Sequence, residues 1–302
     1  MRHILAIDIA GGSLAASFVS DSLDAADVSR LDLAGFAGGD IPPKEKLVAL
    51  LSAKMHAAPG DVCALSIALD CDLSPDRRSI VNSSGAGWMS GEPLADILES
   101  AFGKPVILDR RAQVFLDYDR MTLGLPSDSL IVGCYINNYY ENAIWCGGAM
   151  MTGKSGMAGN IGHMPVHGRE DNCYCGKCGC AELYGSNYRL RQIHSLIFPD
   201  IPYEEIFDRH ADHPILQDFL HMMVYPIAVE VNLLDPDFLV IGGDIPAMSN
   251  FPLRNIEALL REQTYQPFPS ERLCVTPSSI NTANAVVYAA HYGFEKLDNP
   301  ER

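Results

Sequence analysis

The most distinctive chemical feature of this 302-residue sequence is a group of cysteines that follows one histidine. Four of the nine cysteines fall between positions 173 and 180. Three thiolates and one imidazole form a tetrahedral zinc site of the closed, structural type. We therefore expect one structural zinc ion per chain, bound by His163, Cys173, Cys175 and Cys180.

A second ligand set replaces His163 with Cys178, which would give a site of four cysteines. Gly176 and Gly179 favour both sets, because glycine lets the backbone turn tightly enough for nearby sulfurs to converge. Unligated thiols crowded on an exposed loop would invite oxidation. The spacing thus predicts a metal and leaves the two ligand sets open. The remaining cysteines lie in or beside apolar segments and are predicted to be buried thiols: Cys63, Cys71, Cys134, Cys146 and Cys274.

Size and composition indicate a globular chain with more than one core. A length of 302 residues predicts two lobes or domains, and 48% hydrophobic with 20% charged residues is ordinary globular usage. The net charge of -16 argues against a nucleic-acid or anionic-membrane partner. The sequence shows no signal-peptide pattern and no apolar run near the ~20 residues that a spanning helix needs. We expect a cytoplasmic protein, in keeping with cysteines that are used for metal.

The elements that must position these residues alternate between strands and helices. Residues 3–9 and 238–241 are predicted as buried strands, and each ends in a glycine turn, Gly11-Gly12 and Gly242-Gly243. Apolar spacing predicts further helices at 44–57, 93–102, 112–121 and 216–234, and further strands at 62–69, 106–108, 130–136 and 143–146. Such alternation is typical of an α/β architecture. A lobe boundary is expected at 120–127, where Pro126 and small polar residues interrupt the pattern.

A longer motif surrounds the predicted zinc ligands. The run from Gly162 to Val166 precedes the cysteines, and Ala181-Glu182 follows them. Together they resemble the signature of the ROK family of sugar kinases and repressors. The resemblance extends over the whole chain, from Asp8 with its glycine turn to the run from Asn232 to Gly243. Residues 251–279 resemble most the allose-kinase branch.

The resemblance implies an actin-like (ribonuclease H-like), two-lobed sugar kinase fold with an inserted zinc-binding loop. Residues 1–120 would form the N-terminal lobe, with the C-terminal helix of about 283–302 packing back onto it. Residues 121–282 would form the C-terminal lobe, which carries the zinc loop and a homodimer interface. A repressor is not expected, because repressors of the family have a helix-turn-helix ahead of the first strand, which begins here at residue 3.

The resemblance also assigns site residues, with ATP and Mg²⁺ as cofactors if kinase activity survives. Positions that contact nucleotide or phosphate in the family fall on Asp8, Gly11, Gly12, Ser13, Asn137, Asn138, Gly242 and Gly243. Positions that contact or neighbour the sugar fall on His163, Glu182, Asn160, Arg110 and Gly85.

The catalytic base of the family is missing from its position. The family carries it as the aspartate of an Asn-Asp pair, which falls here on Arg110-Arg111. Arginine stays protonated and cannot accept the proton of a sugar hydroxyl. Asp109 lies two residues earlier, but a general base needs hydrogen-bond reach, which such an offset usually forfeits. The alternative is that Asp109 forms an ion pair with Arg110 or Arg111.

Other family positions have changed as well. Tyr139 brings bulk into the second phosphate turn, and Asn160 replaces a sugar-binding glutamate. Gly85 falls where the family has an asparagine, and the first phosphate turn, Gly11-Gly12-Ser13, is shifted or lacks its threonine.

Two functions follow from these substitutions. The first is a weak or inactive kinase, a pseudokinase, that acts through ligand binding. The second is an active ATP-dependent hexokinase for allose or a related hexose. Arg110 and Arg111 could also bind a phosphosugar if both faced the pocket; the alternative is that they pair with acidic neighbours such as Asp109 or Asp117.

Overall fold

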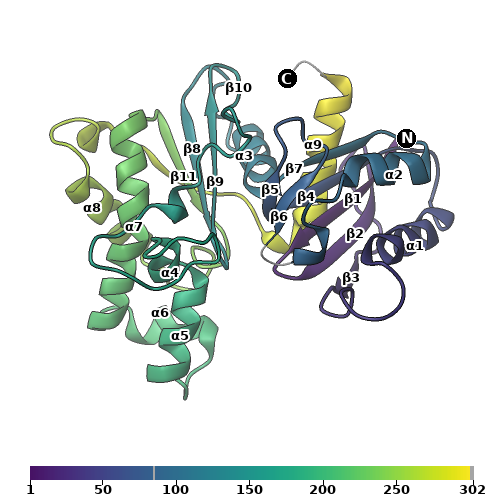
Figure 1. Ribbon diagram of the computed structural model, residues 1–302. Helices are drawn as coiled ribbons and strands as arrows, with labels where there is room; N and C mark the ends of the chain where they lie inside the picture. Colours follow the sequence, from purple (N-terminus) through teal and green to yellow (C-terminus); the bar gives the residue numbers. More distant parts are fainter. Residues whose placement is uncertain (84–85, 300–302) are drawn as a thin grey trace. The chain divides into compact units, whose positions relative to one another are not determined.

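The structure, a computed structural model, describes residues 1–83 and 86–299 (Figure 1). The chain separates into two compact units. Unit 1 comprises Met1–Met121, Thr152–Ala158 and the chain from Ala283 onward, and unit 2 comprises Thr122–Met151 and Gly159–Thr282. Each unit has a sheet and a hydrophobic core of its own.

The sheet of unit 1 has the strand order β3-β2-β1-β4-β7. Its strands are β1 (His3–Ala10), β2 (Ser13–Ser20), β3 (Ser29–Asp32), β4 (Val62–Leu69) and β7 (Val106–Arg110). β1, β4 and β7 run parallel, whereas β2 pairs antiparallel with β1 and β3. Gly11 and Gly12 join β1 to β2 with φ values of 56° and 79°. A two-residue hairpin turn of type I′ needs positive φ at both positions, which explains the glycine pair.

Helices cover both faces of this sheet. α1 (Pro43–His56) and α2 (Leu94–Phe102) contribute Leu47, Leu51 and Leu98 to the core on one face. α9 (Ala285–Asp298) packs on β1 and β4, where the Ser66 hydroxyl donates to the Ala289 carbonyl at 2.6 Å (Figure 1). α3 (Arg111–Thr122) follows β7 directly, and β5 (Cys71–Leu73) pairs with β6 (Ile80–Ser83). Because both faces are covered, β1 is apolar along nearly its whole length.

Unit 2 repeats the same strand arrangement, in the order β10-β9-β8-β11-β12. The strands are β8 (Ile131–Ile136), β9 (Tyr140–Cys146), β10 (Ala149–Met150), β11 (Phe238–Gly242) and β12 (Val275–Pro277). Again an antiparallel hairpin comes first and parallel strands are added beyond it.

The helices of unit 2 bury one face of this sheet. They are α4 (Glu182–Gly185), α5 (Asn187–Ile197), α6 (Ile206–His210), α7 (Pro214–Leu234) and α8 (Leu253–Gln263). α7 places Phe219, Met223 and Ile227 against the core and continues through Pro226, as expected from its apolar spacing. Of the helices in the described ranges, none is long and apolar enough to cross a membrane.

The structure differs from the sequence analysis in two respects, the burial of the cysteines and the strand β2. Cys146 and Cys274 are exposed and Cys63 is only half-buried, so the prediction of five buried thiols was wrong for these three. Cys146 ends β9 at a turn, and Cys274 precedes the edge strand β12, where neighbours on one side are missing. The strand β2 was not predicted, because its small and hydroxyl side chains interrupt the apolar pattern.

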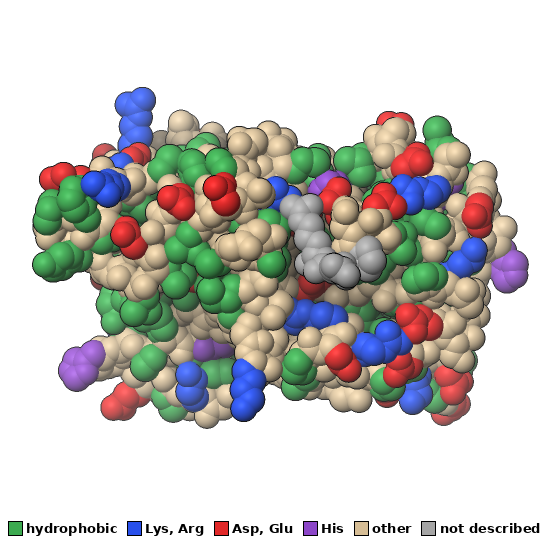
Figure 2. Space-filling model, turned by 90° about the horizontal axis from the view of Figure 1, so that it is seen from above, with side chains coloured by type: hydrophobic (Ala, Val, Ile, Leu, Met, Phe, Trp, Pro, Cys, Tyr) green, Lys and Arg blue, Asp and Glu red, His purple; other side chains and the backbone are tan. Residues whose placement is uncertain are grey.

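On the face shown in Figure 2, acidic and basic side chains are interspersed.

Candidate functional site

The histidine and three of the cysteines come together in unit 2. His163 ends the short helix η2 (Ile161–His163), and Cys173, Cys175 and Cys180 lie on the loop that leads to α4. Their ligand atoms all lie within 4.8 Å of one another. His163 Nδ1 is 3.7 Å from Cys173 Sγ, and the sulfurs of Cys175 and Cys180 are 3.6 Å apart. Ligand atoms of one tetrahedral zinc ion lie about 3.3–3.8 Å apart for bonds of about 2.0–2.3 Å. These four residues could therefore hold zinc.

Cys178 does not belong to this group of ligand atoms. Its side chain is exposed, and its Sγ lies 3.4 Å from Asn172 Oδ1. Backbone bridges between Pro165 and Cys180, and between Asn172 and Cys178, close the loop. The geometry thus favours the His/Cys₃ set over the four-cysteine set.

The environment of the thiols fits a cation at their centre. Burial raises the pKa of Cys180 to about 12. A sulfur with such a pKa stays protonated at neutral pH unless a cation stabilises its thiolate. A zinc ion would supply that charge and cross-link the loop, and within the described part of the chain the group consists of these four ligands.

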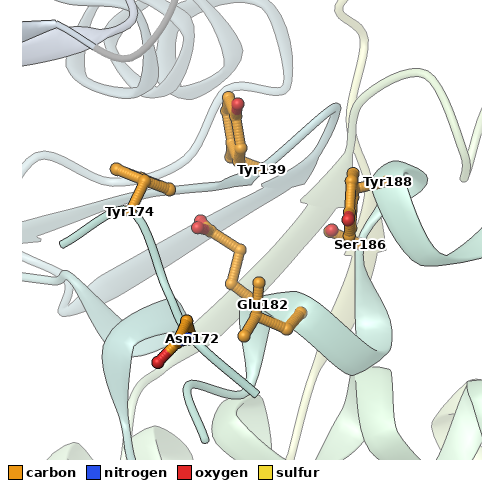
Figure 3. Close-up of a pocket in the computed structure, with 7 residues that line it drawn as sticks. Tyr139, Asn172, Tyr174, Glu182, Ser186 and Tyr188 are labelled. Carbon is orange, nitrogen blue, oxygen red and sulfur yellow. The ribbon is translucent and has the colours of Figure 1, made fainter. Parts of the chain in front are cut away.

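A pocket of about 230 Å³ lies beside the zinc cluster within unit 2 (Figure 3). Its lining residues are Tyr139, Asn172, Tyr174, Glu182, Leu183, Ser186 and Tyr188. Glu182 begins α4, is buried, and accepts a hydrogen bond from the Tyr140 amide at 3.2 Å. The Tyr174 hydroxyl lies 3.3 Å from His163 Nε2. Tyr174 therefore connects the metal cluster to the pocket.

In unit 1 Arg111, which the resemblance assigns to the family's base position, forms an ion pair. Asp8 lies near the end of β1 and Arg111 begins α3 after β7, so parallel strands bring the two to one edge of the sheet. Arg111 Nε donates to Asp8 Oδ1 at 2.7 Å, and both side chains are buried. The guanidinium also lies over the Phe115 ring, 4.8 Å from its centroid. The arginine thus neutralises the aspartate that the resemblance assigns to the phosphate site.

Asp109 and Arg110 are engaged elsewhere. Asp109 accepts a hydrogen bond from the Tyr292 hydroxyl and pairs with Arg77 Nε at 3.3 Å. Arg110 Nη1 donates to the Ala158 carbonyl at 3.1 Å. The expected ion pair of Asp109 with Arg110 or Arg111 was therefore wrong in its partner, because Arg77 reaches the carboxylate from the β5–β6 hairpin.

Both turns assigned to phosphate carry internal hydrogen bonds. The Gly11 amide donates to Asp70 Oδ2 at 2.7 Å, and the Ser13 hydroxyl donates to the Ala10 carbonyl at 3.0 Å. In unit 2, Asn137 Oδ1 accepts from the Asp244 amide at 2.9 Å, just after Gly242 and Gly243.

Asn138, Asn160 and Gly85 are the remaining positions that the resemblance assigns to the site. Asn138 Oδ1 accepts a long hydrogen bond of 3.4 Å from Asn187, which lies at the start of α5. The carbonyl of Asn160 accepts from the His163 amide, so Asn160 begins the turn of η2. Gly85 lies outside the described residues.

Several site residues escaped prediction. Asp70 directly follows β4, at the same edge of the sheet as Asp8. A carboxylate directly after a predicted strand could therefore have indicated a site residue. Tyr174 lies between two predicted ligands, which was a second signal. Arg77, Tyr292, Ser186 and Tyr188 carry no motif in the sequence, because their partners are distant along the chain.

Comparison with known proteins identifies the family. The model of the ROK family matches residues 6–292, so this chain belongs to the ROK family. N-acetylmannosamine kinase of Vibrio cholerae serotype O1 is 26% identical over 246 residues, which cover 80% of this chain and 83% of that kinase.

Solved structures share the mixed α/β fold. A ROK family glucokinase from Streptomyces griseus, solved with glucose and AMPPNP, has a TM-score of 0.76 at 20% identity, covering 96% of this chain and 98% of that chain. A ROK family transcriptional regulator, a homolog of the E. coli MLC protein, has a TM-score of 0.80 at 19% identity. That match covers 96% of this chain and 77% of the regulator.

Proposed function

We propose that this ROK-family protein is a pseudokinase, which has lost or nearly lost phosphoryl transfer and acts by binding a small sugar in unit 2. The ion pair between Arg111 and Asp8 carries this proposal. A general base must accept a proton from the attacking hydroxyl, and a guanidinium cannot. Mg²⁺ bridges phosphate oxygens in such reactions, and at Asp8 it would have to displace a buried guanidinium.

The two phosphate turns support the same function. Backbone amides bind phosphate when they point into an open turn. Here the amides of Gly11 and Asp244 donate to Asp70 and Asn137. Phosphate binding at either turn would have to replace the hydrogen bond of that turn, so ATP and Mg²⁺ are not part of the proposed function.

The test is sugar-dependent formation of ADP by the purified protein, with allose, glucose, mannose and N-acetylmannosamine. We expect negligible turnover, because loss of a positioned base alone costs about 10²–10⁴-fold. Calorimetric titration of the same sugars tests whether binding survives. Ordinary kinase turnover with any of them would refute the proposal.

The second candidate is an active hexose kinase. Its support is the similarity to N-acetylmannosamine kinase over 80% of this chain. The allose specificity expected from residues 251–279 belongs to this candidate. Turnover with allose or N-acetylmannosamine, and its loss in Asp8→Asn, would establish it.

We also propose that the protein forms a homodimer through unit 2. Leu196 and Leu233 of this unit are 79% and 77% exposed, and Tyr265 is 73% exposed. Tyrosine is enriched in interfaces, and exposed apolar side chains that form a contiguous patch mark interaction sites. Light scattering coupled to size exclusion measures the mass, and a monomer of 32.9 kDa would contradict the proposal.

A further inference from the structure

Ser186 is the residue immediately before helix α5, and its extended backbone, with φ of −101° and ψ of 176°, is that of an N-cap. The side chain of an N-cap serine usually accepts a hydrogen bond from an amide of the first helical turn. The Ser186 side chain makes no such bond. Its carbonyl accepts from the Leu190 amide at 3.1 Å, so the helix begins without a contribution from the hydroxyl. The hydroxyl is therefore available to another partner.

The hydroxyl of Ser186 is also buried. The residue is 0% exposed, and its Oγ has no hydrogen-bond partner within the described part of the chain. Ser186 nevertheless lines the unit 2 pocket, and Figure 3 shows it beside Tyr188, on the side opposite Tyr174. Burying a hydroxyl without a hydrogen bond is unfavourable, and buried polar groups are nearly always paired. An unpaired hydroxyl at the wall of a pocket thus points to a bound molecule that completes its hydrogen bonding.

Tyrosine rings form much of the remaining wall of this pocket. Tyr139 and Tyr174 have ring centroids 5.2 Å apart and are tilted by 59°, and Tyr188 is 51% exposed. The face of an aromatic ring is electron-rich, so it packs well against the C–H groups of a sugar ring. Asn172 adds an amide that can both donate and accept hydrogen bonds. Aromatic walls with a few polar groups are typical of sites that orient a small molecule.

We infer that Ser186 is a specificity-determining residue of this pocket, where its hydroxyl forms a hydrogen bond with one hydroxyl of a bound monosaccharide. The volume of about 230 Å³ is below the ~300–1,000 Å³ of pockets for larger ligands. Ser186 lies outside the positions that the resemblance assigns to sugar contact. This inference rests on the proposed sugar-binding function and names the residue that selects among sugars.

The test combines removal of the Ser186 hydroxyl with removal of single hydroxyls from the ligand. Calorimetry on the full-length, zinc-loaded protein measures the affinities of glucose, mannose, allose and N-acetylmannosamine, and of the single-deoxy analogues of whichever sugar binds. For one ring position, the deoxy analogue should bind the wild type about five- to tenfold more weakly than the parent sugar, as expected for one lost hydrogen bond. In Ser186→Ala the parent sugar should be weakened by a similar factor, and the difference between the two ligands should disappear.

A second measurement separates ligand binding from a structural role of the hydroxyl. Because the hydroxyl is unpaired in the free protein, Ser186→Ala should leave the melting temperature of the free protein unchanged or raise it. Ser195→Ala is the matched control, since Ser195 is an exposed serine of the same helix whose hydroxyl donates to the Gln192 carbonyl at 3.0 Å. It should keep the wild-type affinities for every ligand. A lower melting temperature of Ser186→Ala would show that the hydroxyl stabilises the free protein and would contradict the inference.

The remaining outcomes distinguish this inference from the proposed function. Sugar affinity that is unchanged in Ser186→Ala, or deoxy losses that all persist in that variant, would overturn the inference and leave the proposed function intact. Absence of binding for all four sugars would refute both. Sugar-dependent ADP formation together with the expected coupling at Ser186 would refute only the pseudokinase.

Discussion

Two of the buried carboxylates, Asp8 of unit 1 and Glu230 of unit 2, are accommodated in opposite ways. Asp8 is paired with the guanidinium of Arg111 at 2.7 Å. Glu230 of α7 has neutral partners among the described residues: it accepts a hydrogen bond from Asn142 Nδ2 at 2.9 Å and lies 3.9 Å from Cys134 Sγ. Burial raises the pKa of Glu230 to about 8, so this carboxyl is largely neutral at pH 7. Each arrangement makes a separate prediction about stability.

The first prediction concerns the ion pair of Arg111. Arg111→Met leaves the carboxylate of Asp8 buried without its cation, and breaking such a pair costs about 3–5 kcal/mol of unfolding free energy. Replacing both residues, as in Asp8→Asn with Arg111→Met, should cost less than Arg111→Met alone. Denaturant unfolding measures both. Arg2→Met, which breaks the exposed pair with Asp298, is the control and should cost little. Additive effects of the two buried substitutions would show that the pair is not coupled.

The second prediction concerns Glu230 and pH. Its folded-state pKa of about 8 lies above the ordinary value of 4.5, so between these values the folded state binds more protons than the unfolded state. Rising pH therefore lowers stability in this window, by up to about 1.4 kcal/mol per pH unit. Glu230→Gln keeps the shape without the titration, so its unfolding free energy relative to wild type should increase from pH 5 to pH 8. A difference that stays constant with pH would contradict the assignment.

At the scale of elements, the zinc loop is a unit whose ligands lie within 18 residues. Short backbone bridges close it, and Cys178 faces Asn172 and not the other sulfurs. α4 begins two residues after Cys180 and carries Glu182 into the pocket. The loop therefore determines both the arrangement of the four candidate ligands and the position of the pocket carboxylate.

The third prediction distinguishes the two ligand sets. Cys178→Ser should retain one zinc per chain, whereas Cys180→Ser should lose it, because only Cys180 lies within 4.8 Å of the other ligand atoms. Elemental analysis after gel filtration measures the zinc content. The reverse result would favour the four-cysteine site, and protein without zinc in any form would exclude both.

At the scale of the whole molecule, the same strand order appears twice. Each unit begins its sheet with a hairpin and adds two parallel strands, and each buries its own cluster of apolar side chains. Separate cores allow separate unfolding transitions. The zinc cluster belongs to unit 2 alone.

The fourth prediction follows from that placement. Removing zinc with a chelator should lower the melting temperature, because the binding free energy of a structural metal contributes to folding. Hydrogen exchange should accelerate in the loop and in α4 and α7 of unit 2, while β1 and β4 of unit 1 keep their protection. Equal acceleration in both units would show that they unfold as one.

The sequence by itself determined the features that rest on local chemistry. Ligand types and spacing predicted the His/Cys₃ cluster, and apolar runs ending in glycine predicted β1 and β11. The family motif around the candidate zinc ligands could be recognised because its residues lie close together in the sequence. These signals are short in range, so a single sequence carries them in full.

Only the tertiary structure decided which charges meet. Arg111 pairs with Asp8, which lies 103 residues away, and Asp109 pairs with Arg77 and Tyr292 instead of its sequence neighbours. The pocket likewise joins Tyr139 and Tyr174, which lie in two separate loops, to Tyr188 of α5. Such partners are selected by strand order and helix packing, because a buried charge is stabilised by whichever opposite charge the fold brings within reach.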